Sequence, residues 1–126
     1  MPAHPERISS VTQYISEHIN EPLPRVRLAS VAGFSVPHLH RVFTACVGQS
    51  IAAYVRRLRL RRAAQKLLMG AVDITEVALA AGYDTHAAFG KAFKQEYGLS
   101  PGELRRINSF EGLQLLKRGT QNENKA

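Results

Sequence analysis

The chain has 126 residues, of which 44% are hydrophobic and 21% are charged, and it contains a single cysteine. That length suits one compact domain or two small lobes, and the apolar content excludes an intrinsically disordered chain. One cysteine excludes an internal disulfide and the Cys-rich kinds of zinc site. Because no apolar run approaches the ~18 residues of a membrane span and the N-terminus has no signal-peptide hydrophobic region, we expect a soluble cytoplasmic protein. No cofactor is expected.

Charge is the second compositional signal. Lys and Arg number 17 against 10 Asp and Glu, which gives a net charge of +7 and a pI of about 10.1. No acidic residue lies between Pro22 and Val72, where nine basic residues are found: Arg25, Arg27, Arg41, Arg56, Arg57, Arg59, Arg61, Arg62 and Lys66. Such a segment is typical of a protein that binds a polyanion, most often nucleic acid. The alternative is a solvated basic face that maintains solubility.

Helical periodicity runs through the chain, and no alternating β-branched stretch predicts a strand. The first helix is predicted by four apolar residues at steps of three and four: Ile8, Val11, Ile15 and Ile19. It is expected to end near Glu21 and Pro22. Further helices are predicted around residues 25–32, 36–47, 50–69, 74–81, 85–97 and 101–108. The fold class is therefore all-α, with about seven helices.

Helix ends carry their own signals. Asp73 with Glu76, and Ser100 with Glu103, have the spacing of a capping box at a helix start. Gly98 lies where a helix C-cap is expected.

An internal repeat of about 50 residues defines the architecture. The first copy covers residues 29–50 and the second covers residues 78–100. Each copy reads as a short helix, a tight turn at a glycine (Gly33 or Gly82) and a second helix. An alanine four residues before each glycine lets the two helices approach closely, and the glycine allows positive φ in the turn. The repeat predicts two helix-turn-helix subdomains.

The segment between the copies, residues 50–69, has an apolar stripe that changes sides midway. One face of its first half carries Ile51, Tyr54, Val55 and Leu58, and the opposite face of its second half carries Leu60, Ala63, Ala64, Leu67 and Leu68. Such a helix is expected to pack against a different lobe at each end. The predicted organisation is an N-terminal helix and first lobe (1–49), a long linker helix (50–69), a second lobe (70–108) and a C-terminal tail (109–126).

Ten segments carry a family resemblance: Leu28–Ser35, His38-Leu39, Arg41–Phe43, Gly48–Ser50, Arg61–Leu68, Ile74–Ala78, Gly82-Tyr83, Phe89, Phe93-Lys94 and Tyr97–Pro101. Together they resemble the DNA-binding region of the AraC/XylS family of bacterial transcription regulators. The resemblance extends from about Ile8 to Arg106, and the short chain resembles the stand-alone MarA/SoxS/Rob type. It implies a monomer that places two recognition helices in successive major-groove segments of double-stranded DNA. It also implies activation through contacts with RNA polymerase.

The outward faces of the two second helices hold the candidate DNA contacts. The helix beginning at Val36 carries Pro37, His40, Arg41 and Thr44 opposite its apolar stripe. The helix beginning near Thr85 carries His86, Ala87, Gly90, Lys91 and Lys94. Val36 and Thr85, at the starts of the two helices, are candidate DNA contacts as well. Ala87 and Gly90 offer no polar side chain at positions that often read bases in the family, so the base specificity of the second lobe stays open.

Each candidate has a chemical role and a plain alternative. Arg41 can bond guanine O6 and N7 bidentately, or it can contact phosphate or solvent. His40 and His86 can reach a base edge or a phosphate, or stay solvated. The lysines suit phosphate, and Thr44 and Ala87 can contact a thymine methyl group. The helix starts at Ser50 and Ser100 can bind phosphate, although both serines are also explained by capping.

No catalytic or metal-binding constellation is evident. His38 and His40 are two residues apart on a helix, so their rings diverge and cannot share a metal. Cys46 falls on the apolar stripe with Phe43 and Val47 and is expected in the core rather than as a reactive thiol. We therefore do not expect an enzyme.

The leading hypothesis is a sequence-specific transcription regulator, most simply an activator. A second hypothesis is the DNA-targeting module of a larger effector-responsive regulator, suggested by the apolar cluster at Leu113, Leu115 and Leu116. A third is a basic module that binds an acidic protein partner, although such a module needs no matched outward faces on two copies.

Overall fold

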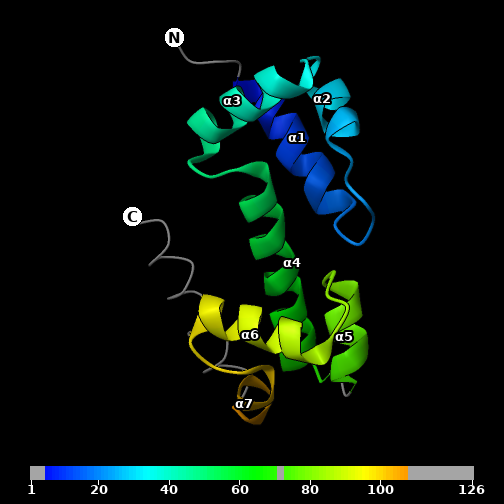
Figure 1. Cartoon of the computed structure of the whole chain (residues 1–126), viewed down its shortest axis with the longest axis vertical. Coiled ribbons are helices and arrows are strands. Elements are labelled where there is room, and N and C mark those ends of the chain that lie inside the picture. The colour runs from blue at the N-terminus through cyan, green and yellow to red at the C-terminus, as the bar shows by residue number, and fades with distance from the viewer. Residues whose placement is uncertain (1–4, 71–72, 108–126) are drawn as a thin grey trace. The chain divides into compact units, whose positions relative to one another are not determined.

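The computed structural model describes residues 5–70 and 73–107, which form helices, turns and loops. The helices there are α1 (Pro5–Glu17), α2 (Arg25–Ala32), α3 (Val36–Val47), α4 (Ile51–Leu68), α5 (Ile74–Ala80), α6 (His86–Tyr97) and α7 (Pro101–Arg106) (Figure 1). The all-α prediction is thereby confirmed over the described part of the chain. The predicted tail at 109–126, with its leucine cluster at 113–116, lies outside the described residues.

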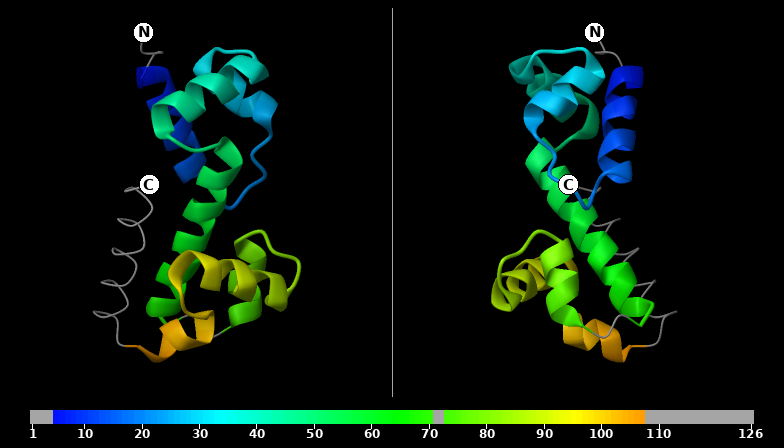
Figure 2. Two further views of the ribbon diagram at one scale, coloured as in Figure 1. Left: turned by 60° about the vertical axis from the view of Figure 1, so that its left-hand side comes forward. Right: turned by 90° about the vertical axis from the view of Figure 1, so that its right-hand side faces the viewer.

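Two compact units divide the chain within α4, between Leu58 and Arg59. In the first unit α1, α2 and α3 contact one another, and Figure 2 shows α1 beside α2 and α3. Leu39 and Phe43 of α3 are fully buried there, and the first half of α4 contributes Ile51 to the same core.

The second unit is built from the second half of α4 together with α5, α6 and α7. Its core contains Leu60, Ala63, Ala64, Leu67, Val77, Ala78, Ala81, Phe89, Phe93 and Leu104. The prediction that α4 turns different apolar faces to two lobes is confirmed, because Ile51 and Val55 belong to one core and Leu60 and Leu67 to the other.

The structural repeat is longer than the sequence motif. In α1 an arginine is followed by three buried aliphatic residues, Arg7, Ile8, Val11 and Ile15, and α4 repeats this order 52 residues later with Arg59, Leu60, Ala63 and Leu67. Serine also precedes both α4 and α7, at positions 50 and 100. Each unit therefore contains four helical segments, and α4 serves as the last segment of the first and the first segment of the second.

The two predicted turns are confirmed. Gly33 and Gly82 have φ values of 74° and 93°, a region that glycine adopts without steric cost. After each glycine, an aromatic residue donates its backbone N–H to the helix just ended: Phe34 to Ala29 O at 3.0 Å, and Tyr83 to Ala78 O at 3.1 Å. These bonds satisfy carbonyl groups that a helix end leaves without intrahelical partners.

The first helix ends earlier than predicted. α1 stops at Glu17, and residues 18–20 form a turn, although Ile19 is still buried. The His18 N–H donates to both Tyr14 O and Ile15 O, which is the tightening often found in a last helical turn. The buried position of Ile19 continued the apolar pattern beyond the helix itself.

The prediction of a core cysteine is wrong, because Cys46 is exposed. The buried residues of α3 are Leu39, Val42 and Phe43, and in the last turn only Val47 packs against the core. Periodicity gives the direction of a side chain around the helix axis. It does not tell which part of a broad apolar stripe the core contacts, and in the last turn of α3 the core contacts Val47 and leaves Cys46 exposed.

Candidate nucleic-acid interface

The outward face of α3 is a short polar and basic surface. Pro37, His40, Arg41 and Thr44 are all exposed, while Leu39 and Phe43 on the opposite side are fully buried. Val36, at the first position of the helix, is half-buried and packs against the core of the first unit. The Ser35 hydroxyl caps the helix by accepting the His38 N–H at 3.3 Å.

The equivalent face of α6 has the same frame with smaller side chains. Phe89 and Phe93 are fully buried, and the exposed residues are His86, Ala87, Lys91 and Lys94. Gly90 is half-buried, yet a Cβ placed on it would meet no atom within 4 Å. Thr85, which is exposed, caps the helix by accepting the Ala88 N–H at 3.0 Å. The structure thus brings the other candidates of each helix onto one exposed face, while Val36 and Gly90 are half-buried.

The starts of α4 and α7 differ in charge. The Ser50 hydroxyl accepts the Ala53 N–H at 3.1 Å, and no acidic residue lies in the first turn of α4. At α7 the Ser100 hydroxyl accepts the Glu103 N–H, and a Glu103 carboxylate oxygen accepts the Ser100 N–H at 2.7 Å. The predicted capping box at Ser100 is therefore confirmed. The Glu103 carboxylate already accepts the Ser100 N–H, and its negative charge disfavours a phosphate at the start of α7. Ser50 is therefore the better phosphate candidate of the two.

The hydrogen bonds of this capping box also affect the ionisation of Glu103. Donation from the Ser100 backbone N–H, followed by the Ser100 side-chain hydrogen bond, lowers the pKa of the Glu103 carboxyl below its ordinary value. Hydrogen bonds to the charged form favour that form. The side chain therefore stays ionised to a lower pH than an unbonded glutamate.

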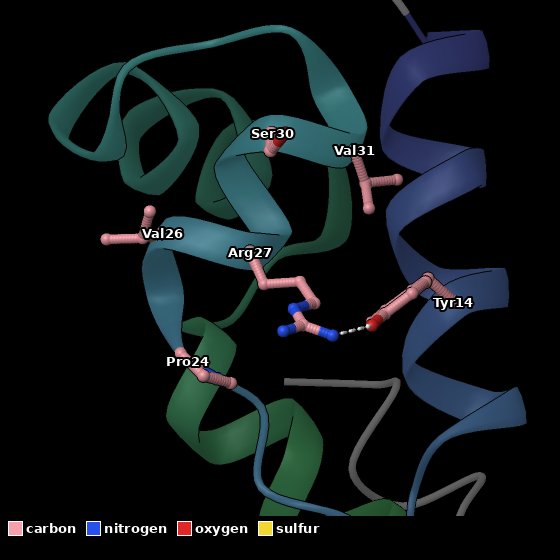
Figure 3. Close-up of a pocket in the computed structure, with 6 residues that line it drawn as sticks. All are labelled: Tyr14, Pro24, Val26, Arg27, Ser30 and Val31. Carbon is pink, nitrogen blue, oxygen red and sulfur yellow. Dashed lines mark hydrogen bonds between the residues drawn. The ribbon is translucent and has the colours of Figure 1, made fainter.

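An open groove on the first unit was not found from the sequence. It has a volume of about 640 Å³ and is lined by Tyr14, Pro24, Val26, Arg27, Ser30 and Val31 (Figure 3). The Arg27 guanidinium donates to the Tyr14 hydroxyl at 3.4 Å, and this bond raises the pKa of Arg27. Val26 is 73% exposed, which is unusual for a large apolar side chain. Its place off the buried positions of α2 (Leu28, Ala29 and Ala32) is the signal that could have revealed the groove.

The described residues hold neither a metal-binding cluster nor a membrane-spanning helix. Within 5–70 and 73–107, no group of three or more His, Cys, Asp or Glu side chains lies close enough together to hold a metal ion. None of the helices in those ranges combines the length and the apolar character needed to cross a bilayer.

Comparison with known proteins gives the same family that the sequence resembles. A family described as "Helix-turn-helix domain" matches residues 28–107. The transcriptional regulator Rob of Salmonella typhimurium is 34% identical over 97 residues, which cover 77% of this chain and 34% of Rob. The regulatory protein SoxS of the same organism is 30% identical over 103 residues, which cover 82% of this chain and 96% of SoxS.

A solved structure has the same fold. The crystal structure of an AraC-type transcriptional regulator from Chromobacterium violaceum superimposes with a TM-score of 0.74 at 27% identity, and the match covers 79% of this chain and 89% of that one. Two helix-turn-helix units joined through a shared helix define the class. This chain belongs to the AraC-type family of helix-turn-helix transcription regulators, a family of regulators rather than of enzymes. It spans about a third of the length of Rob and of other curated relatives that it matches.

Proposed function

We propose that this chain binds double-stranded DNA with sequence specificity and thereby regulates transcription. The observation that carries the proposal is the pair of equivalent exposed faces on α3 and α6, each backed by two fully buried core residues. Arg41 of α3 and Lys91 of α6 occupy the same position in the repeat, and both are basic. Family membership and the net charge of +7 support the same function.

In this proposal α3 and α6 are recognition helices that enter successive segments of the major groove. Arg41 reads a base through its guanidinium, while Lys91 and Lys94 neutralise phosphates. His40 and His86 reach base edges or phosphates. Thr44 and Ala87 approach thymine methyl groups, and the free amides at the start of α4, next to Ser50, receive a phosphate.

The remaining residues of these faces act through shape. Val36 is the first residue of α3, Thr85 is the N-cap of α6, and Pro37 is exposed on the first turn of α3. Gly90 leaves the centre of the α6 face open, so that DNA can come close to the helix backbone. We infer that the second unit contributes more to holding DNA than to reading it.

Family membership also suggests where the chain acts and how it regulates transcription. We propose that the chain acts as a cytoplasmic bacterial regulator, binds DNA as a monomer, and activates transcription by contacting RNA polymerase. SoxS, which this chain matches over almost the whole length of that protein, supports a regulator that consists of these two units alone. No catalytic step is part of the proposal.

A second candidate function is the DNA-targeting module of a longer, effector-responsive regulator. The supporting observation is the match to only about a third of Rob and of the YbfP regulator of Bacillus subtilis. The length of the native gene product separates the two candidates. A product much longer than 126 residues supports the targeting module, and one of this length supports the stand-alone regulator.

Selection of bound duplexes from a randomised library tests the main proposal, followed by titration of the selected duplex across salt concentrations. We expect two short sequence blocks about one helical turn apart, with stronger base preference in one block than in the other. No enriched motif together with a steep salt dependence would mean that the charge binds phosphates without reading sequence. Lack of duplex binding at moderate salt would instead favour an acidic protein partner.

A further inference from the structure

An arginine from another helix lies over each of the two turn glycines. A Cβ placed on Gly33 would lie 3.7 Å from Nη1 of Arg7 in α1. A Cβ placed on Gly82 would lie 3.3 Å from Nη1 of Arg59 in α4. Gly48, Gly70 and Gly98 also have positive φ, but a Cβ on any of them would meet nothing within 4 Å. The arginine therefore accompanies the helix-turn-helix turn and not positive φ in general.

The two arginines occupy the same position in the structural repeat. Arg7 and Arg59 each precede a buried aliphatic residue, Ile8 and Leu60, which belongs to the core of its own unit. The arginine thus lies next to a fixed anchor in both units. Two independent copies of one arrangement make a chance surface contact a poor explanation.

Each guanidinium lies where a helix ends. α2 and α5 terminate at these turns, and the C-terminal end of a helix carries partial negative charge on its last carbonyl groups. A cation there stabilises the end of the helix and so the geometry of the chain that leaves it. In the first unit Arg7 also lies over the Phe34 ring, 5.3 Å from its centroid, in a cation–π arrangement.

The contact continues from Phe34 to the recognition helix. The Phe34 ring lies 4.5 Å from the His38 ring in α3, centroid to centroid. Arg7 in α1, Phe34 in the turn and His38 in α3 therefore form a continuous path of contacts. His38 lies in the first turn of α3, three residues before Arg41, so the path reaches the recognition helix about one turn before that candidate base contact.

We propose that Arg7 and Arg59 are positioning residues that fix the turn of each helix-turn-helix unit and thereby the direction of α3 and α6. The effect of these arginines on base discrimination rests on the proposed function, whereas their role in fixing the turns does not. Neither arginine needs to touch DNA.

The test uses Arg7→Gln and Arg59→Gln in the full chain, with Arg105→Gln as a control that removes the same charge from an exposed position. In the protein without DNA, residual dipolar couplings report the direction of α3 relative to α1, and amide exchange reports the turn. We expect Arg7→Gln to change the α3 couplings and to speed exchange at Phe34 by a factor of about 2 to 5, with Tyr83 unchanged. Arg59→Gln should affect α6 and Tyr83 instead, and Arg7→Lys should restore part of the loss.

Binding to cognate and scrambled duplexes gives the second readout. We expect Arg7→Gln to lower the cognate-to-scrambled affinity ratio severalfold, while its affinity for the scrambled duplex matches that of Arg105→Gln. Unchanged couplings and exchange would overturn the positioning role. A faster-exchanging turn with unchanged α3 couplings would also overturn it, because the arginine would then stabilise the turn without directing the helix. If the wild type itself shows no preference for any duplex, the proposed function fails, and the couplings in the free protein still decide the role of the arginines.

Discussion

The helices α3 and α6 have the same capping and buried residues, but their outward faces differ in chemistry. Both helices follow a capping hydroxyl residue, bury two large side chains four residues apart, and end at a glycine with positive φ. Where α3 presents His40 and Arg41, α6 presents Gly90 and Lys91. The duplicated sequence has kept what folds the helix and has varied what faces outward. The residues that fold each helix and the candidate DNA contacts therefore lie at different positions of the same repeat.

The largest expected effect is a loss of stability, and it tests the buried residues that α3 and α6 have in common. Phe43→Ala and Phe93→Ala each remove a fully buried ring that packs against another aromatic ring, Tyr54 at 5.5 Å and Tyr97 at 5.0 Å between centroids. We expect each variant to lower the free energy of unfolding by about 3–5 kcal/mol, measured by urea denaturation. Val26→Ala, at an exposed site, is the control and should change it by less than about 0.5 kcal/mol. If the free energy of unfolding of either variant fell by no more than that of the control, the core described for that unit would be contradicted.

The next effect tests the difference between the two faces. Arg41→Ala should reduce discrimination at a single base pair of the selected duplex by about 1–3 kcal/mol, because a bidentate donor to guanine is lost. Lys91→Ala should instead weaken all duplexes by a similar factor and lower the salt slope by about 1. Binding titrations with single-base variants of the duplex measure both. A base-specific loss from Lys91→Ala as large as that from Arg41→Ala would remove the asymmetry.

A smaller effect of opposite sign is expected at Gly90. Because a Cβ there meets nothing and glycine is unfavourable inside a helix, Gly90→Ala should raise the free energy of unfolding by roughly 0.5–1 kcal/mol. Gly98→Ala is the matched control, since its φ of 80° disfavours any side chain and should make it destabilising. Thermal unfolding distinguishes the signs. Destabilisation by Gly90→Ala would mean that the centre of α6 is less open than described.

The smallest effect concerns pH and the starts of α4 and α7. Because the pKa of Glu103 is lowered in the folded chain, its contribution to stability is complete above the ordinary pKa of an unfolded glutamate and is lost as pH falls through the lower folded value. Glu103→Gln keeps an acceptor but cannot titrate, so the variant should lose less stability than the wild type over that acidic range. Denaturation at a series of pH values measures this. Ser50 has Ala53 at the corresponding position, so the first unit has no such contribution. Identical acid profiles for variant and wild type would contradict the capping box.

Much of the fold could be predicted because the signals were local. Turn glycines, the capping serines and the change of apolar face in α4 each need only a few neighbouring residues. The extension of the repeat to α1 was missed because Val11 and Ile15 match Ala63 and Leu67 only in burial. The exposure of Cys46 and the groove beside Val26 depend on where the neighbouring helices contact α3 and α2, which periodicity does not encode.

For the candidate site, the sequence predicted which face of each helix is exposed. Helical geometry alone placed His40, Arg41 and Lys91 opposite the buried rings, and their exposure agrees. The base or phosphate that each residue contacts depends on the partner, so these assignments stay predictions. The arginines over the turn glycines could not be found from sequence, because Arg7 and Gly33 are far apart in the chain.

The shared helix α4 limits how the protein can be divided. The boundary between the compact units falls between Leu58 and Arg59, inside a continuous helix. Cleavage there would leave four amide groups on one fragment and four carbonyl groups on the other without intrahelical partners. Two separately made halves that each keep all 18 residues of α4 would overlap there and would leave the hydrogen bonds within this helix intact.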